Sequence, residues 1–214
     1  MRVIILGGTG LVGSHLIQLM LEDSRYSEIV SFTRRSHGIS HPKFTEVICD
    51  LFELENQVDQ FHGDAVFCCI GTTLKKTPDR DIYQKIDKGI PVAAAKMADK
   101  NNIPTFIVVS SMGADAGSSI FYNRTKGEME EAVLETEIPK IHIVRPSLIG
   151  GDRQESRFGE SFGKFLFGIL NPIIPKKYKM VHPKTIAQAM LHLADGNQEE
   201  AIVESDQILV LGKS

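Results

Sequence analysis

The sequence predicts an α/β fold, in which one doubly wound and mostly parallel sheet carries helices on both faces. Strand-like apolar runs recur along the chain, and segments with helical periodicity separate most of them. Strands that alternate with helices form parallel sheets, because each helix returns the chain across the sheet before the next strand. A chain of 214 residues with 42% hydrophobic residues can bury such a core, so we expect a single domain over residues 1–214.

The expected strands are short runs rich in β-branched and aromatic residues. They are Val3–Leu6, Ile29–Thr33, Phe44–Ile48, Ala65–Ile70, Phe106–Ser110, Lys140–Val144 and Ile208–Leu211. The expected helices place apolar residues at helical spacing. They are His15–Leu21, Pro91–Lys100, Tyr122–Glu135 and Thr185–Leu193. Because ligands of parallel sheets bind at the carboxyl ends of the strands, the residues that follow each strand indicate function.

The first expected strand, Val3–Leu6, runs directly into a glycine-rich turn and then into a helix-like segment. A strand, a glycine turn and a helix in this order are typical of a dinucleotide-binding site. We expect Gly8 to make the tight turn, Gly10 to let the backbone approach a pyrophosphate, and Gly13 to let the helix pack on the strand. Free N–H groups and the positive dipole end at the helix start favour the phosphates.

Two arginines, Arg34 and Arg35, follow the second expected strand. An acidic residue at this distance from the glycines normally binds the ribose 2′-hydroxyl of NAD, and the sequence has none there. Arginine suits a 2′-phosphate, because its guanidinium group donates charged and often bidentate hydrogen bonds. The pattern favours NADP(H) over NAD(H); a solvated basic pair is the alternative.

The third and fourth expected strands are also followed by candidate cofactor residues. Asp50 could accept a hydrogen bond from an adenine amino group, with Leu51 against the ring, or it could cap the helix that follows. The sequence leaves both roles of Asp50 open. Gly71 and Thr72 form a turn after the fourth strand, where the backbone can approach the middle of a cofactor.

Ser110 and Ser111 end the fifth expected strand, and Tyr122 and Lys126 follow on an expected helix. Residues four apart on a helix lie on the same face. A tyrosine with the reference pKa of about 10 is a poor acid or base at neutral pH. A nearby ammonium group and a cationic nicotinamide would favour its phenolate form. Together with the glycine turn and the serines, the pair predicts acid/base chemistry at a tyrosine.

These motifs together resemble the short-chain dehydrogenase/reductase superfamily, and within it the atypical branch that contains the HIV Tat-interactive-protein-like oxidoreductases. The residues that carry the resemblance are GGTGLVG, the serine pair, YNRTK and RPSLIGGDRQESR, and they span nearly the whole chain. The resemblance implies a seven-stranded Rossmann-like sheet and NADP(H) as cofactor. It also implies Tyr122 as proton donor, Lys126 on the nicotinamide ribose, and Ser111 on the substrate oxygen.

The sequence departs from this family pattern at one position and leaves one serine open. Many relatives carry an asparagine in the helix before the fifth strand, and the nearest residue here is Asp87. If the strand register differs by one residue, Ser110 takes the place of Ser111, because neighbouring side chains on a strand face opposite ways. The complete set of expected cofactor residues is Gly7, Gly8, Thr9, Gly10, Leu11, Val12, Gly13, Arg34, Arg35, Asp50, Leu51, Gly71, Thr72, Tyr122, Lys126, Pro146, Ser147 and Leu148.

The region at about 150–182 is expected to set substrate specificity. The charged run Asp152–Arg157 is either solvated or, through Arg153 and Arg157, holds an anionic group of the substrate. The apolar run Phe158–Leu170 has near-helical spacing, which is typical of a core helix. The alternatives are a lid over the substrate and a docking face for a protein partner or a membrane.

Composition excludes several classes of protein. A net charge of −3 argues against nucleic-acid binding, and no run approaches the ~18 apolar residues that span a membrane. Three cysteines cannot form a disulfide framework, and no histidine, cysteine or carboxylate pattern predicts a metal site. The chain enters a core strand at once, which is unlike a signal peptide. A soluble, cytoplasmic protein is expected.

The sequence therefore predicts an NADP(H)-dependent oxidoreductase that acts on a small carbonyl or alcohol, with Ser111, Tyr122 and Lys126 as the catalytic residues. The alternative is an NADPH-sensing regulator or scaffold with little turnover, since a fold alone does not imply activity. An epimerase or dehydratase of nucleotide sugars would normally need a larger substrate domain. A homodimer is left open.

Overall fold

The computed structural model describes residues 1–150, 178–196 and 198–213. Within these residues seven strands form one sheet in the order β3-β2-β1-β4-β5-β6-β7. Every neighbouring pair is parallel. The strands are β1 (Arg2–Leu6), β2 (Glu28–Thr33), β3 (Phe44–Ile48), β4 (Ala65–Cys68), β5 (Thr105–Val109), β6 (Lys140–Arg145) and β7 (Ile202–Glu204).

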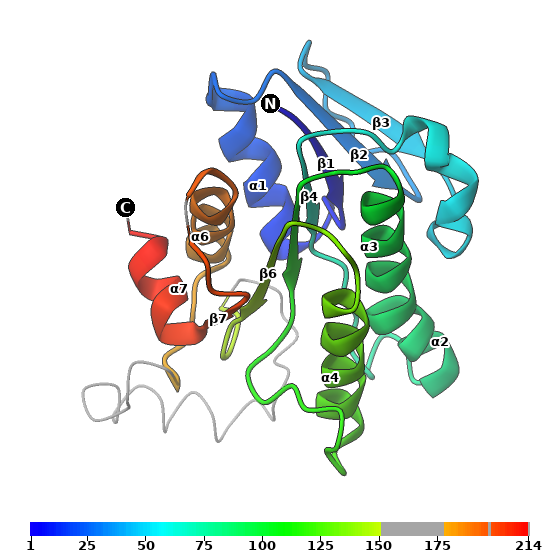
Figure 1. The fold of residues 1–214 in the computed structure, drawn as a ribbon, viewed down its shortest axis with the longest axis vertical. Helices are drawn as coiled ribbons and strands as arrows, with labels where there is room; N and C mark the ends of the chain where they lie inside the picture. Colours follow the sequence, from blue (N-terminus) through cyan, green and yellow to red (C-terminus); the bar gives the residue numbers. More distant parts are fainter. Residues whose placement is uncertain (151–177, 197, 214) are drawn as a thin grey trace.

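Among the described residues, helices follow every strand except β2, which a loop joins to β3, and they cover both faces of the sheet (Figure 1). They are α1 (Leu11–Glu22), the 3-10 helix η1 (Leu51–Gln60), α2 (Arg80–Gln84), the π-helix η2 (Lys85–Gly89), α3 (Ile90–Lys100), α4 (Phe121–Leu134), α6 (Pro183–Asp195) and α7 (Ser205–Leu211). This is the α/β architecture that the alternation of apolar runs and helical segments predicts. The doubly wound, Rossmann-like sheet is confirmed.

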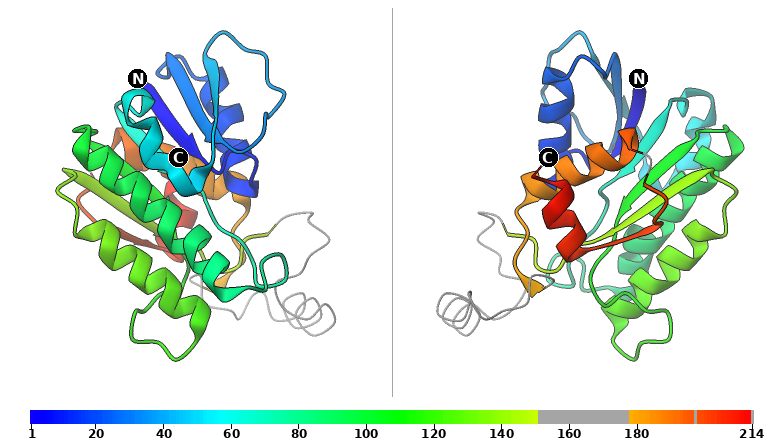
Figure 2. Two further views of the ribbon diagram at one scale, coloured as in Figure 1. Left: turned by 90° about the vertical axis from the view of Figure 1, so that its right-hand side faces the viewer. Right: turned by 60° about the vertical axis from the view of Figure 1, so that its left-hand side comes forward.

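Two hydrophobic cores lie on opposite faces of the sheet. The two turned views in Figure 2 show the helices that cover these faces. Val3 and Ile5 of β1 face the core with α1, α6 and α7. Ile4 and Leu6 face the other core, with η1, α3 and α4. Side chains of a strand alternate between its faces, so a strand that is buried on both faces must be apolar throughout.

The prediction of a strand at Ile208–Leu211 is wrong. These residues belong to the helix α7, and the seventh strand is the shorter run Ile202–Glu204. A short apolar run does not distinguish a strand from a buried helix by periodicity alone. The helix begins at a capping box in which the side chains of Glu204 and Gln207 bind each other's backbone N–H groups. Ile208 then packs into the core beside α6.

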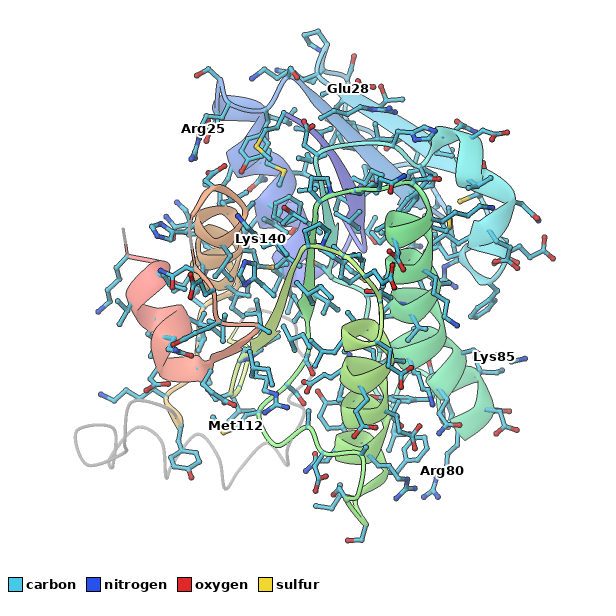
Figure 3. All side chains as sticks on the ribbon, viewed as in Figure 1. Arg25, Glu28, Arg80, Lys85, Met112 and Lys140 are labelled. Atoms are coloured by element: carbon cyan, nitrogen blue, oxygen red, sulfur yellow. The ribbon has the colours of Figure 1, made fainter. Side chains whose placement is uncertain are left out.

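The other expected elements are confirmed, with ends that differ by a few residues. The expected strand Ala65–Ile70 ends at Cys68, and the fifth strand is Thr105–Val109, so both serines follow it. Figure 3 places Met112, just after β5, at one edge of the sheet and Glu28, at the start of β2, at the opposite edge. The carboxyl edge marked by Met112 is the edge where the candidate residues gather.

Candidate functional site

The tight turn after β1 is made by Gly7 rather than by Gly8, which corrects the expected role of Gly8. Gly7 has φ of 80°, and the N–H of Gly10 donates to its carbonyl oxygen at 2.9 Å. A Cβ atom on Gly7 would lie 2.6 Å from the carbonyl oxygen of Cys69. Position 7 therefore requires glycine, because only glycine adopts this φ without a Cβ penalty and leaves room for the carbonyl oxygen of Cys69.

The remaining glycines let α1 begin close to the strand. A Cβ on Gly13 would lie 2.3 Å from the carbonyl oxygen of Gly7, so Gly13 permits the helix–strand contact that the sequence predicts. Gly8 is buried, and a Cβ there would meet the side chains of His37 and Ile17. Gly10 is the N-cap of α1 and has no side chain to bind the first N–H groups, which leaves them free for an anion.

A cavity of about 370 Å³ opens beside this turn. It is lined by residues from the glycine turn, the end of β2 and its following loop, η1, and the segment after β4. They are Gly7, Thr9, Phe32, Thr33, Arg34, Arg35, Leu51 and Ile70. The two arginines are exposed, and neither guanidinium group forms an ion pair with any residue that the structure describes. They can therefore meet an anionic ligand.

The loop that carries the arginines is fastened to the sheet on both sides. The hydroxyl of Thr33 donates to the carbonyl oxygen of Arg35 at 2.9 Å. The Glu46 carboxylate accepts from the Ser36 hydroxyl at 2.6 Å and from the His37 N–H at 2.5 Å. The Ser36 hydrogen bond, more than its other contacts, lowers the pKa of Glu46. These bonds hold the loop against the cavity.

Asp50 fills one of the two roles that the sequence left open. Its carboxylate accepts from the N–H of Phe52 at 2.9 Å and so caps η1. Leu51, the next residue, is buried and lines the cavity. Asp50 itself is exposed and does not line the cavity. The adenine contact of Asp50 stays a prediction.

Tyr122 and Lys126 lie on α4, and Lys126 forms a buried ion pair. The Lys126 Nζ atom lies 3.1 Å from Oδ1 of Asp87, and the two side chains are 4% and 1% exposed. Burial alone would lower the pKa of Lys126, but the charge of Asp87 and the interaction with Tyr122 outweigh it and raise the pKa. Tyr122 is half-buried and close enough to interact with Lys126 electrostatically.

The two serines after β5 have different surroundings. The Ser110 hydroxyl donates to the buried carboxylate of Glu130, which is also paired with the guanidinium group of Arg145. The hydroxyl oxygen of Ser111 is buried and has no hydrogen-bond partner among the described residues. Buried polar atoms are nearly always paired, so an unpaired hydroxyl at the carboxyl edge fits a ligand contact. Ser110 instead helps to fasten α4 to β6.

The segment after β6 is held by the C-terminal part of the chain. The N–H of Ser147 donates to the Ser205 hydroxyl at 3.3 Å, and the Ser147 hydroxyl donates to the carbonyl oxygen of Lys179. The N–H of Met112 donates to the carbonyl oxygen of Pro146 at 2.9 Å. Pro146 and Ser147 therefore form hydrogen bonds within the protein. The expected contacts of Pro146, Ser147 and Leu148 with a cofactor stay predictions.

Several residues of the site carry no motif that sequence reasoning could use. Phe32, Thr33 and Ile70 line the cavity but look like ordinary strand residues. Glu130 is a charged residue on a charged helix, and only its burial distinguishes it. The runs Asp152–Arg157 and Phe158–Leu170, with the proposed roles in substrate binding or docking, lie outside the described residues.

The arrangement fits a dinucleotide. A glycine turn with free helix N–H groups suits a pyrophosphate, and the cavity with Arg34 and Arg35 suits a phosphorylated ribose and its base. The unpaired Ser111 hydroxyl lies after β5, the strand whose following helix bears Tyr122. Fold and site together define a dinucleotide-binding protein of the α/β class.

Comparisons with known proteins agree with this class. A family model described as NAD(P)H-binding matches residues 7–159. Protein HTATIP2 of Rattus norvegicus is 32% identical over 99% of this chain and 89% of its own length. Protein FMP52, mitochondrial, of Meyerozyma guilliermondii is 30% identical over 97% of this chain and 94% of its own length. The chain therefore belongs to the NAD(P)H-binding family, within the atypical short-chain dehydrogenase/reductases.

Solved structures share the fold at low sequence identity. MoeE5 in complex with UDP-glucose and NAD has a TM-score of 0.70 at 15% identity, covering 99% of this chain and 81% of that one. UDP-N-acetylglucosamine 4-epimerase from Methanobrevibacter ruminantium M1 has a TM-score of 0.70 at 18% identity, covering 94% of this chain and 75% of that one. At such identities the likeness shows the fold alone.

The relatives correct the expected cytoplasmic location. Fungal relatives, among them those of Meyerozyma guilliermondii and Candida albicans, are named mitochondrial. The expectation was wrong because composition and an ordinary charge balance do not distinguish one aqueous compartment from another. Among the residues that the structure describes, no helix is long and apolar enough to cross a membrane.

Proposed function

We propose that this protein is an NADP(H)-dependent oxidoreductase that transfers hydride to or from a small carbonyl or alcohol, with Tyr122 as general acid and base. The observation that carries the proposal is the position of the Tyr122–Lys126 pair. It lies on the helix that follows β5, and the buried pair with Asp87 fixes the ammonium group. The unpaired Ser111 hydroxyl belongs to the same strand-to-helix connection.

The cofactor would be held by the residues that line the carboxyl edge. The N–H groups at the start of α1 would bind the pyrophosphate, and Leu51 would lie against the base. Arg34 and Arg35 would bind a 2′-phosphate, which is the reason for preferring NADP(H) to NAD(H). When bound, the nicotinamide supplies or accepts the hydride at the substrate carbon.

Three side chains would act on the substrate oxygen and its proton. Tyr122 donates a proton to the oxygen during reduction and accepts one during oxidation. Ser111 donates a hydrogen bond to the same oxygen and fixes its position. Lys126 holds the nicotinamide ribose and stabilises negative charge on the phenolic oxygen of Tyr122. The phenolic proton is then replaced from solvent.

The experiment that tests the proposal compares the wild-type protein with Tyr122→Phe on a panel of carbonyl compounds. NADPH oxidation is followed by its absorbance, and NADPH affinity is measured separately by titration. We expect the variant to bind NADPH like the wild type and to lose activity by about 100-fold or more. Unchanged turnover of a good substrate would remove Tyr122 from the mechanism.

An NADPH-sensing regulator or scaffold is the second candidate function. The observation that favours it is the neutralisation of Lys126 by Asp87, since a compensated ammonium group stabilises a phenolate less. Tight NADPH binding with no oxidation by any compound of the panel would support this function over the enzyme. A homodimer and the docking of a protein partner through residues 158–170 remain predictions.

A further inference from the structure

A buried carboxylate lies among the proposed catalytic residues. Asp87 is 1% exposed and belongs to η2, the π-helical turn between α2 and α3. π-Helical turns are rare and occur often at functional sites. One oxygen of Asp87 lies 3.1 Å from Nζ of Lys126, and the other accepts from the N–H of Thr72 at 2.7 Å.

Gly71 lies directly over this ion pair. A Cβ atom on Gly71 would lie 3.5 Å from Oδ1 of Asp87 and 3.9 Å from Nζ of Lys126. Asp87 thus joins three elements: its own π-turn, α4 through Lys126, and the turn after β4 through Thr72. The turn after β4 is where the sequence predicts the middle of the cofactor.

Among the residues that the structure describes, Lys126 and Asp87 are the charged groups of the buried ion pair, and Cys68 and Tyr122 lie near it. Cys68 of β4 also interacts with the pair, but burial first, and then Asp87, raise the pKa of its thiol to about 11, so it is uncharged at neutral pH. The Lys126 pKa is raised despite burial, which keeps its ammonium form. Lys126 and Asp87 therefore carry charges of opposite sign, and the sum is zero.

We propose that Asp87 sets the preference of the site for the oxidised or reduced cofactor, because its carboxylate cancels the charge of Lys126 beside the nicotinamide. The proposal rests on the proposed function, which brings the nicotinamide next to Lys126. The ring is cationic in NADP⁺ and neutral in NADPH. A net charge of zero lets the site hold both forms, whereas an unpaired ammonium group repels only the oxidised form.

The charge of the pair can be changed in both directions. Asp87→Asn keeps the shape and removes the negative charge, Lys126→Met removes the positive charge, and the double variant removes both. A unit charge within several ångströms is worth at least a factor of ten at the effective dielectric of a protein site. We therefore expect the ratio of Kd for NADP⁺ to Kd for NADPH to rise about tenfold in Asp87→Asn and to fall about tenfold in Lys126→Met.

The ratio is measured by calorimetric titration of each variant with NADP⁺ and with NADPH. The double variant should return to the wild-type ratio, although both affinities fall because Lys126 no longer holds the ribose. Adenosine 2′,5′-bisphosphate, which has no nicotinamide, should bind all variants equally. Asp79→Asn is the matched control, because it removes the same charge from an exposed helix cap that asparagine also serves.

The outcomes separate this proposal from the proposed function. A ratio that stays within twofold in both single variants, or that moves in the same direction in both, would overturn the role of Asp87. If one single variant does not fold, the other still shows in which direction the ratio of the two dissociation constants changes. Failure of the wild-type protein to bind either dinucleotide would instead contradict the proposed function itself.

Discussion

The ammonium group of Lys126 lies 3.1 Å from a carboxylate oxygen of Asp87, and both side chains are almost completely enclosed. The pair links α4, the helix that carries Tyr122, to the π-turn η2. A second pair, between the half-buried Arg145 and the buried Glu130, links the same helix to β6. The helix that carries the proposed acid/base is therefore fastened by charge on both sides.

The first prediction concerns the stability that depends on this pair. Removing one partner leaves the other charge buried and unpaired, so Lys126→Met should lower the free energy of unfolding by about 3 kcal/mol. Combining it with Asp87→Asn removes both charges and should recover part of that loss. Urea denaturation of the wild type, the two single variants and the double variant measures the coupling free energy between Lys126 and Asp87. Losses that simply add would show that the pair is not a unit.

The second prediction separates the two serines. Ser110→Ala removes a hydrogen bond from the buried Glu130 carboxylate, so we expect a loss of about 1–2 kcal/mol in stability with turnover largely kept. Ser111→Ala removes a hydroxyl without a partner among the described residues, so stability should be unchanged while turnover falls. Thermal melting and NADPH oxidation are measured for both variants and compared with the wild-type protein. The reverse pattern would assign the catalytic role to Ser110.

The third prediction concerns the choice of cofactor. Replacing Arg34 and Arg35 by alanine should weaken NADP⁺ binding by about tenfold to a hundredfold and leave NAD⁺ binding unchanged. Each hydrogen bond to a charged phosphate accounts for part of that loss. Arg25→Ala is the control, because Arg25 lies at the opposite edge of the sheet in an exposed ion pair (Figure 3). Equal losses for NAD⁺ and NADP⁺ would count against a 2′-phosphate contact.

The fourth prediction compares two glycines, Gly7 and Gly38, that both have a positive φ angle. Gly38 has φ of 70° with nothing within 4 Å of a Cβ, so Gly38→Ala should cost about 1 kcal/mol for the backbone alone. Gly7→Ala meets the carbonyl oxygen of Cys69 at 2.6 Å as well and should cost about 3 kcal/mol or more. Denaturation curves give the difference. Similar costs would mean that the turn can move away from β4.

The fifth prediction concerns stability at acidic pH. Burial lowers the pKa of His142 below 6.5, and its Nε2 atom has no partner among the described residues. As the pH falls below about 6.5, the unfolded chain binds this proton and the folded protein does not, so stability is lost. His142→Gln should lose less stability than the wild type between pH 7.5 and 5.5. His62→Gln, at an exposed position, should behave like the wild type.

Local sequence patterns were sufficient to predict those parts of the site that residues close together in the sequence form. The glycine turn, the arginines after β2 and the Tyr122–Lys126 spacing are each contained in a short stretch, and the structure places them at one edge of the sheet. The order of strands and helices then follows from the alternation of apolar runs. These features depend on chain-local geometry, which a single sequence contains.

Features that depend on distant contacts could not be predicted. The need for glycine at position 7 comes partly from the carbonyl oxygen of Cys69, a residue that follows β4 and is distant in the sequence. Asp87 stood out in the sequence only as a departure from a family pattern, and its pairing with Lys126 requires the packing of two helices. At the C-terminus the apolar run Ile208–Leu211 suited either a strand or a helix, and packing against α6 decided for the helix.

The most direct test of the central claim is a crystal structure of the protein grown with NADP⁺. We expect the pyrophosphate on the N–H groups at the start of α1, the 2′-phosphate at Arg34 and Arg35, and the nicotinamide ribose within hydrogen-bond distance of Lys126. The Tyr122 hydroxyl should then lie beside the nicotinamide ring. A nicotinamide bound away from Tyr122, or crystals with no dinucleotide at a saturating concentration, would contradict the account.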